Sequence, residues 1–256
     1  MRLKRLREDW ERLAEHDAYW AVLSDPAKRG GKWDVDAFYA SGQAEIDYVM
    51  SYAGALRPDL ARGDALDFGC GPGRLTYALA AHFSHAVGVD ISAPMIELAE
   101  RRRGTVQNCD FICNDRDDLS VLLDASFDFV YSRIVLQHMP AALALGYVSE
   151  FVRILRPGGL ALFQIPEPLL SPLAQARRGL SHLLRGASDD AKTIRMFGVP
   201  RAEVSRQVSA AGGRLLNVAA DGSAGAGTVG WLYAVVPGSQ PTGPAPGPIP
   251  EWQTPP

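Results

Sequence analysis

A glycine-rich run between Ala65 and Leu75 constrains the fold of this chain more than any other feature; it reads Ala-Leu-Asp-Phe-Gly-Cys-Gly-Pro-Gly-Arg-Leu. Its first residues are apolar enough for a short buried strand. Gly69, Gly71 and Gly73 then allow the backbone to turn sharply and to approach a ligand without hindrance from a Cβ atom. Apolar residues at helical spacing follow, so free N–H groups of the loop are expected at a helix N-terminus, where a carboxylate is favoured.

A second acidic residue closes the next apolar run. This run, His85–Asp90, reads His-Ala-Val-Gly-Val-Asp and predicts a short strand that ends on Asp90. A carboxylate at the end of the second strand suits the two hydroxyl groups of a ribose, because it only accepts hydrogen bonds. A glycine loop alone also occurs in dehydrogenases, flavoproteins and plain strand–helix turns, but the two features together indicate a nucleoside-binding crevice.

Strands and helices alternate along the central part of the chain. Helices are expected over 38–56, over 92–102 and directly before Pro157-Gly158-Gly159. Further short apolar strands are expected at Cys109–Cys113, Phe127–Ser132 and Leu160–Ile165. This alternation predicts an α/β fold with a doubly wound parallel sheet.

The loop reads Gly-x-Gly-x-Gly behind an in-strand Asp67, whereas dinucleotide enzymes carry Gly-x-Gly-x-x-Gly. In this respect the chain resembles the class I S-adenosylmethionine-dependent methyltransferases, in particular the small-molecule branch grouped as type 11. The resemblance spans roughly residues 67–163. Its further landmarks follow in the family's order: Asp90, then Asn114-Asp115, the strand over 127–132, and Leu155-Arg156-Pro157-Gly158-Gly159.

The resemblance implies a Rossmann-like sheet of seven strands in the order 3-2-1-4-5-7-6, with the last strand antiparallel. Arg214–Ala219 would be the sixth strand and Trp231–Val236 the seventh. The switch point then falls between strands one and four, so a ligand is expected over Gly69–Gly73 on one side and Ser132–His138 on the other.

The resemblance also implies a cofactor, S-adenosylmethionine, and a role for each matching residue. The three glycines would surround its methionine moiety, Asp67 would face its ammonium group, and Asp90 would accept from both ribose hydroxyls. Asp115 would accept from the adenine amino group, with side chains packing around the rings. The expected cofactor-binding residues are Asp67, Gly69, Cys70, Gly71, Gly73, Asp90, Ile91, Met95, Asn114, Asp115, Arg116 and Ser132.

Several of these residues also have a purely structural interpretation. Asp115 belongs to a crowded acidic segment that would also form a solvated turn, and Ile91 and Met95 would also serve as ordinary core residues. Two candidate catalytic residues likewise have both a functional and a structural interpretation. His138, beyond the fourth strand, is either a general base or a histidine that hydrogen-bonds a neighbouring loop. Tyr39 either contacts the methionine end or the acceptor, or packs in the core.

Methyl transfer from a sulfonium needs mainly a well-placed nucleophile. The Asn/Asp-Pro-Pro-Tyr/Phe motif of nucleic-acid methylating relatives is replaced by Ser132-Arg133-Ile134-Val135, and no paired acids with a histidine indicate a metal. We therefore expect a small-molecule acceptor methylated at oxygen or nitrogen, without a metal. A nicotinamide oxidoreductase would need the other glycine motif, whereas an S-adenosylmethionine-binding protein without turnover remains an alternative.

Composition and net charge exclude some classes of binding partner. The chain has 256 residues, 47% of them hydrophobic, and a net charge of −3, so neither nucleic acid nor a membrane span is expected. Three cysteines without a zinc spacing indicate free thiols in a reducing compartment, which predicts a cytoplasmic protein. The N-terminal amphipathic segment is expected to pack on the domain, with a membrane-surface helix as the alternative. The sequence does not indicate the oligomeric state.

The domain organisation follows from these assignments. A methyltransferase domain is expected over 1–236 and a disordered Pro/Gly-rich tail over 237–256. In the segment 167–199, which we regard as an insert, an apolar face and an excess of arginine fit either a substrate cap or a solvated helix pair. The expected parts of the domain are an N-terminal helical lid over 1–60, a cofactor-binding core over 61–166, the cap insert over 167–199 and C-terminal strands over 200–236.

Overall fold

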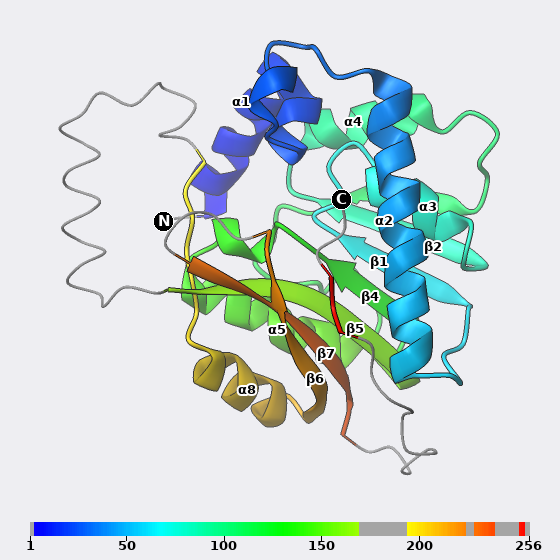
Figure 1. The fold of residues 1–256 in the computed structure, drawn as a ribbon, viewed down its shortest axis with the longest axis vertical. Coiled ribbons are helices and arrows are strands. Elements are labelled where there is room, and N and C mark those ends of the chain that lie inside the picture. The colour runs from blue at the N-terminus through cyan, green and yellow to red at the C-terminus, as the bar shows by residue number, and fades with distance from the viewer. Residues whose placement is uncertain (1–2, 169–193, 224–227, 239–250, 254–256) are drawn as a thin grey trace, which may run out of the picture.

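A computed structural model describes residues 3–168, 194–223, 228–238 and 251–253 (Figure 1). Seven strands form one sheet: β1 (Asp64–Phe68), β2 (His85–Asp90), β3 (Cys109–Cys113), β4 (Phe127–Ser132), β5 (Leu155–Pro168), β6 (Gly213–Asp221) and β7 (Thr228–Pro237). The α-helices are α1 (Leu3–Val22), α2 (Val35–Leu56), α3 (Arg74–Ala80), α4 (Ala93–Arg102), α5 (Ala141–Ile154) and α8 (Arg201–Ala210). Two 3₁₀ turns, Pro26–Lys28 and Leu136–His138, complete the described elements.

The strand order is β3-β2-β1-β4-β5-β7-β6, as the sequence predicts. The first five strands pair in parallel, and β7 is antiparallel to both β5 and β6. The order reverses between β1 and β4. In an open α/β sheet, a crevice beyond the carboxyl ends of the strands is expected at such a point.

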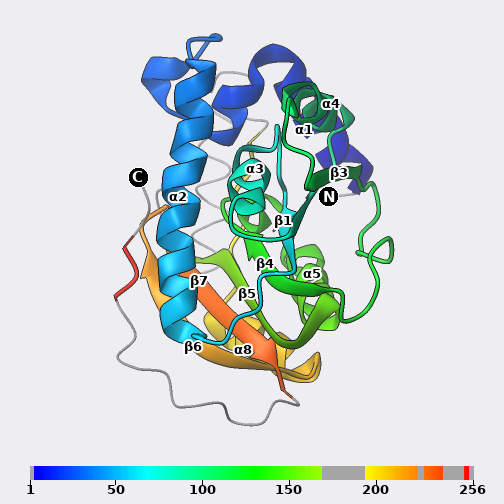
Figure 2. The ribbon, with the colours of Figure 1, turned by 90° about the vertical axis from the view of Figure 1, so that its right-hand side faces the viewer.

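Alternate residues along each strand pack against different helices. Ala65, Phe129 and Leu162 share a buried cluster with residues of α2 and α3, whereas their neighbours Leu66 and Phe163 pack with α5 and α8. Figure 2 shows α2 and α3 on one face of the sheet and α5 on the other. Because side chains alternate across a strand, both faces must be covered when apolar residues point to both of them, as they do here.

The N-terminal helix α1 packs against α4, and its Leu6 joins the core cluster formed by the sheet and α5. Small buried residues of α1, among them Ala14 and Ala18, form a separate cluster with Met95 of α4. The helix contains a kink at Asp17, whose carboxylate accepts hydrogen bonds from the N–H groups of Gly30 and Gly31. This carboxylate therefore ties α1 to the turn that leads into α2.

Several elements are longer than expected, and β5 differs most, since it begins at Leu155 rather than at Leu160. β5 continues beyond Ile165 to Pro168, because antiparallel pairing with β7 extends over residues 161–168. The expected insert over 167–199 therefore begins inside a strand, and residues 169–193 lie outside the described part of the chain.

The prediction of a disordered tail is wrong for residues 251–253. Trp252 is 6% exposed and lies against Tyr48 and Tyr52 of α2, with ring centroids 5.2 and 4.9 Å away. The N–H of Gln253 donates to the Tyr48 hydroxyl at 2.6 Å. A single large aromatic side chain buries enough apolar area to anchor a segment whose composition otherwise favours disorder. Among the described helices, none combines the length and apolarity that a membrane span requires.

Candidate functional site

A pocket lies beyond the carboxyl ends of β1, β2 and β4, where the strand order reverses, and encloses about 1000 Å³ of space including its open mouth. Its floor is the glycine loop and the segment after β4. Residues of α1 and the turn after it, including Leu6, Trp10 and Val22, form the opposite wall. Among the residues predicted from the sequence, the pocket is lined by Gly69, Cys70, Gly71, Asp90, Ile91, Met95, Asn114 and His138.

The glycine loop is held by its own backbone. The N–H groups of Gly69 and Cys70 both donate to the carbonyl of Val89, and that of Gly73 donates to the carbonyl of Cys70. All three glycines have positive φ, of +79°, +52° and +84° for Gly69, Gly71 and Gly73, a region that side chains rarely adopt. The loop N–H groups were expected to be free for a carboxylate. That expectation is wrong for these residues, because each donor already has a protein acceptor.

Asp90 lies at the end of β2 and lines the pocket. One carboxylate oxygen accepts from the N–H of Gly71 at 2.9 Å, and the other accepts from the N–H of Ser92 at 2.8 Å. Burial raises the pKa of Asp90, while these backbone hydrogen bonds oppose the rise. Each oxygen keeps a second lone pair, so the side chain can hold the loop and still accept from two ligand hydroxyls.

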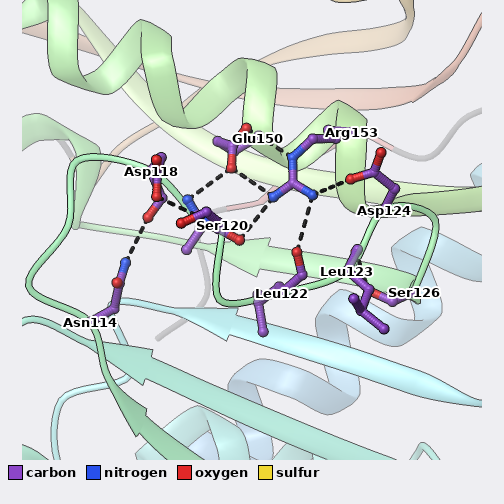
Figure 3. A network of polar contacts seen from close by, with 10 residues as sticks. Asn114, Asp118, Ser120, Leu122, Leu123, Asp124, Ser126, Glu150 and Arg153 are labelled. Carbon is purple, nitrogen blue, oxygen red and sulfur yellow. Dashed lines mark hydrogen bonds and ion pairs between the residues drawn. The ribbon is translucent and has the colours of Figure 1, made fainter.

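Asn114 is buried in the pocket wall, and an ordered loop fixes it (Figure 3). Its amide donates to the carbonyl of Asp118 at 2.8 Å. The N–H of Leu119 in turn donates to Glu150 of α5 at 2.8 Å. Arg153, on the same helix, donates to the carbonyls of Leu119 and Leu122 at 2.9 and 3.1 Å. Helix α5 therefore determines the shape of the loop that carries Asn114.

Asp115 and Arg116 are exposed and do not line the pocket. Asp115 forms an ion pair with Arg7 of α1 at 3.3 Å, and the carbonyl of Arg116 accepts from the Tyr147 hydroxyl at 2.6 Å. The ion pair joins α1 to the loop after β3. In this arrangement Asp115 connects the two walls of the crevice.

Asp67 lies beneath the glycine loop and does not line the pocket. It is 1% exposed, and its carboxylate accepts from the hydroxyl of Thr76 at 2.7 Å. Burial raises its pKa to about 7, against the opposing effect of the Thr76 hydrogen bond. Burial therefore favours the protonated form of this side chain at pH values where an exposed aspartate is ionised.

A buried charged cluster, Glu45, Arg74, Tyr131, Arg133 and Asp221, lies at the other end of the pocket and was not predicted from the sequence. Glu45 of α2 accepts from Arg74 at 2.7 Å and from the Tyr131 hydroxyl at 3.0 Å. Arg133 lies 3.1 Å from Glu45 and 3.6 Å from Asp221. The two arginines hold the pKa of Glu45 below its usual range although burial opposes them. Glu45, Arg74 and Arg133 all line the pocket.

One sequence signal could have indicated this cluster. Glu45 stands on the apolar side of α2, next to Ile46, where a buried acid requires a partner. The identity of the partners could not be inferred, because they come from α3, β4 and β6.

His138 is buried beside the pocket, and both ring nitrogens have protein neighbours. Nδ1 lies 2.9 Å from the carbonyl oxygen of Arg195, which can only accept, so Nδ1 carries the proton. Nε2 faces the Gln137 amide nitrogen at 3.2 Å, and Gln164 donates to the Gln137 amide oxygen at 3.4 Å. The Gln164 oxygen accepts from the N–H of Ile134 at 3.3 Å.

The backbone donor at Ile134 therefore sets the orientation of both glutamine amides and makes Nε2 of His138 an acceptor. Burial lowers the pKa of His138, so the ring is neutral near pH 7. Ile134 itself has a φ of +62°, which is strained for a β-branched residue. The segment after β4 is thus held in a costly conformation next to the pocket.

The remaining predicted residues lie outside the pocket lining. Tyr39 donates its hydroxyl to the carbonyl of Pro72 at 2.8 Å, so it contacts the glycine loop from the α2 side. Ser132 donates to the carbonyl of Phe68 at 3.0 Å, joining the ends of β4 and β1. Gly73 is the left-handed cap of α3.

The chain matches known methyltransferases in sequence. A family model described as a methyltransferase domain matches residues 66–163. A ubiquinone biosynthesis O-methyltransferase of Methylococcus capsulatus is 30% identical over 172 residues, which cover 64% of this chain and 70% of that protein. The protein of the same name from Xanthomonas oryzae pv. oryzae is 29% identical over 133 residues, 50% of this chain, and the match spans only 52% of its length.

Solved structures share the fold at low sequence identity. A Leishmania major S-adenosylmethionine-dependent methyltransferase superimposes with a TM-score of 0.63 at 15% identity, covering 91% of this chain and 82% of that one. The magnesium protoporphyrin IX methyltransferase of Synechocystis PCC 6803 gives 0.61 at 17% identity, covering 90% and 97%.

Proposed function

Because the chain belongs to the class I S-adenosylmethionine-dependent methyltransferases, we propose that it binds S-adenosylmethionine in this pocket and methylates a small molecule at oxygen or nitrogen. The observation that carries the proposal is the convergence of Asp90, Asn114 and the glycine loop, whose turn requires positive φ, on one pocket where the strand order reverses. The O-methyltransferase names of the relatives favour oxygen.

Each part of the pocket has a distinct task in this proposal. The free lone pairs of Asp90 accept from the ribose hydroxyls, and Met95 and Ile91 cover the adenine. Asn114 presents its side chain beside the base from the loop that Arg153 orders. Asp115 keeps its proposed contact with the adenine amino group only if its exposed ion pair with Arg7 opens.

The chain's contribution to the reaction is placement. When bound, S-adenosylmethionine supplies an activated methyl group on a sulfonium, and an acceptor held in line with the methyl–sulfur bond requires little further help. Apolar residues of α1 form the pocket wall opposite the glycine loop and limit the access of water to a bound ligand. Tyr39 supports the loop through the carbonyl of Pro72 rather than acting on the acceptor.

His138 is the residue that we propose as general base for a hydroxyl acceptor. Its neutral ring offers Nε2 as the proton acceptor, after the acceptor hydroxyl replaces the Gln137 N–H at that nitrogen. Because burial lowers the pKa of His138, activity should rise with pH only below about 6.5 and be flat above it. His138→Ala should lower turnover by roughly 10²–10⁴ with cofactor affinity unchanged.

The function is tested by release of S-adenosylhomocysteine from S-adenosylmethionine in the presence of a panel of phenols and amines. The matched control is Gly71→Val, which removes the pocket's loop geometry. Release that depends on one acceptor and disappears in the control supports the proposal. Tight binding of S-adenosylmethionine without release for any acceptor would instead favour a binding protein without turnover.

A further inference from the structure

The guanidinium of Arg133 lacks the hydrogen bonds that a buried arginine normally makes. Its side chain is 5% exposed, and Nε is buried without a hydrogen-bond partner among the described residues. Its two ion pairs join Nη1 to Glu45 at 3.1 Å and Nε to Asp221 at 3.6 Å, a distance too long for a hydrogen bond. A buried polar group without a partner is rare and calls for an explanation.

The two neighbouring acids do not depend on Arg133 for their hydrogen bonds. Glu45 has Arg74 at 2.7 Å and the Tyr131 hydroxyl at 3.0 Å. Asp221 accepts from the N–H and the hydroxyl of Ser223 at 3.1 and 2.8 Å. Arg74 also has a buried Nε without a partner, but its Nη1 and Nη2 both donate to side chains, those of Ser41 and Glu45, so Arg133 is the less fully bonded arginine of the cluster.

We propose that Arg133 is a carboxylate-binding residue of this pocket. It lines the cavity at the carboxyl end of β4, and a guanidinium presents paired N–H donors that match the two oxygens of a carboxylate. The glycine loop cannot take over this task, because the N–H groups of Gly69, Cys70, Gly71 and Gly73 are all used within the protein.

Two molecules could bring the carboxylate, namely the amino-acid end of the cofactor or a carboxylic-acid acceptor. The proposal rests on the proposed function, since both ligands belong to methyl transfer. The two sources can be separated by ligands that differ only in this group. S-adenosylhomocysteine and 5′-methylthioadenosine share the nucleoside and the sulfur, but only the former has the amino-acid end; 4-hydroxybenzoate and 4-hydroxybenzamide differ in charge.

The experiment measures binding of these four ligands by calorimetry to the full chain, with the benzoate pair added after saturation with S-adenosylhomocysteine. The variants are Arg133→Leu and Arg133→Lys, and the control is Arg101→Leu, an exposed arginine of α4 that pairs with Glu97 on the same helix. Because Arg133→Leu leaves Glu45 and Asp221 less compensated, Arg133→Lys keeps the test valid if the leucine variant does not fold.

If the carboxylate is the cofactor's, affinity for S-adenosylhomocysteine falls about 10–150-fold in the variants, and affinity for 5′-methylthioadenosine is unchanged. If it is the acceptor's, S-adenosylhomocysteine affinity is unchanged and the preference of the wild type for the benzoate over the benzamide is lost. If the variants change neither, the proposal is overturned. Wild type that binds neither nucleoside refutes the cofactor assignment itself, and lack of turnover with normal binding refutes only the enzymatic proposal.

Discussion

The two ends of the pocket are built in different ways. The end at Asp90 and Asn114 is formed by residues that follow consecutive strands, β2 and β3, and each is fixed by nearby backbone groups. The end at Glu45, Arg74 and Arg133 is formed by side chains from α2, α3 and β4, whose charges hold one another. The first end is a local motif, and the second exists only after the fold has assembled.

The comparison indicates which property a mutation at each end should change, ligand binding or the stability of the fold. Backbone hydrogen bonds leave little freedom at the glycine loop, so a change there should affect binding more than folding. A buried charged cluster has the opposite property, because removing one partner leaves an uncompensated charge in the interior and destabilises the fold.

Gly71→Val should have the largest effect and should abolish cofactor binding. Gly71 has a φ of +52°, and a Cβ at this position would lie 3.0 Å from Val22 of the wall opposite the loop. A β-branched residue is strained in this region of φ. Calorimetry with S-adenosylhomocysteine should show no measurable affinity.

Gly146→Ala is the matched control for this variant. Gly146 lies in α5 with open space around its Cβ position, so alanine should raise the free energy of unfolding by about 0.5–1 kcal/mol and leave affinity unchanged. A folded Gly71→Val protein that binds as well as wild type would show that the loop is only a structural turn.

Glu45→Leu tests the charged end and should act mainly on stability. Removing this acid leaves Arg74 and Arg133 facing each other in the interior, and breaking a buried pair costs about 3–5 kcal/mol. Denaturant unfolding measures the loss. Glu97→Leu, at an exposed ion pair on α4, should change stability by no more than about 0.5 kcal/mol. Equal effects of the two variants would contradict the difference between the two ends.

Asp90→Ala should weaken S-adenosylmethionine binding by about 1.5–3 kcal/mol, the range for hydrogen bonds to a charged group. The same variant frees the N–H of Gly71 and loosens the loop. Asp115→Ala removes only an exposed ion pair with Arg7, so it should weaken S-adenosylmethionine binding by less than about 1 kcal/mol. If Asp115 proves the more important residue, the adenosine end is bound differently from this proposal.

The last test concerns Asp67, which lies beneath the glycine loop, and its effect is a slope of stability against pH. Its pKa is raised to about 7 in the folded protein, so the folded state binds more protons than the unfolded state between about pH 4 and 7. Stability of the ligand-free protein should therefore fall with rising pH across this window, by at most about 1.4 kcal/mol per pH unit for this group. Asp67→Asn should remove that part of the slope, and an unchanged slope would argue against a raised pKa.

The strand order followed from the family resemblance, whereas the sequence by itself determined the strands of the sheet and the position of Asp90 and Asn114 at the pocket. These features depend on local patterns: short apolar strands, glycines at positions that require positive φ, and an acid at the end of a strand. Such patterns act through neighbouring backbone, so they can be read without knowing which distant segments meet.

Only the tertiary structure decided the rest of the site. It placed Asp67 under the loop rather than in the pocket, used the loop N–H groups internally, and packed Trp252 against α2. It also brought together Glu45 and Arg133, which are far apart in the chain. The physical reason is that a buried charge or aromatic ring is stabilised by whichever partners surround it, and packing rather than spacing selects those partners.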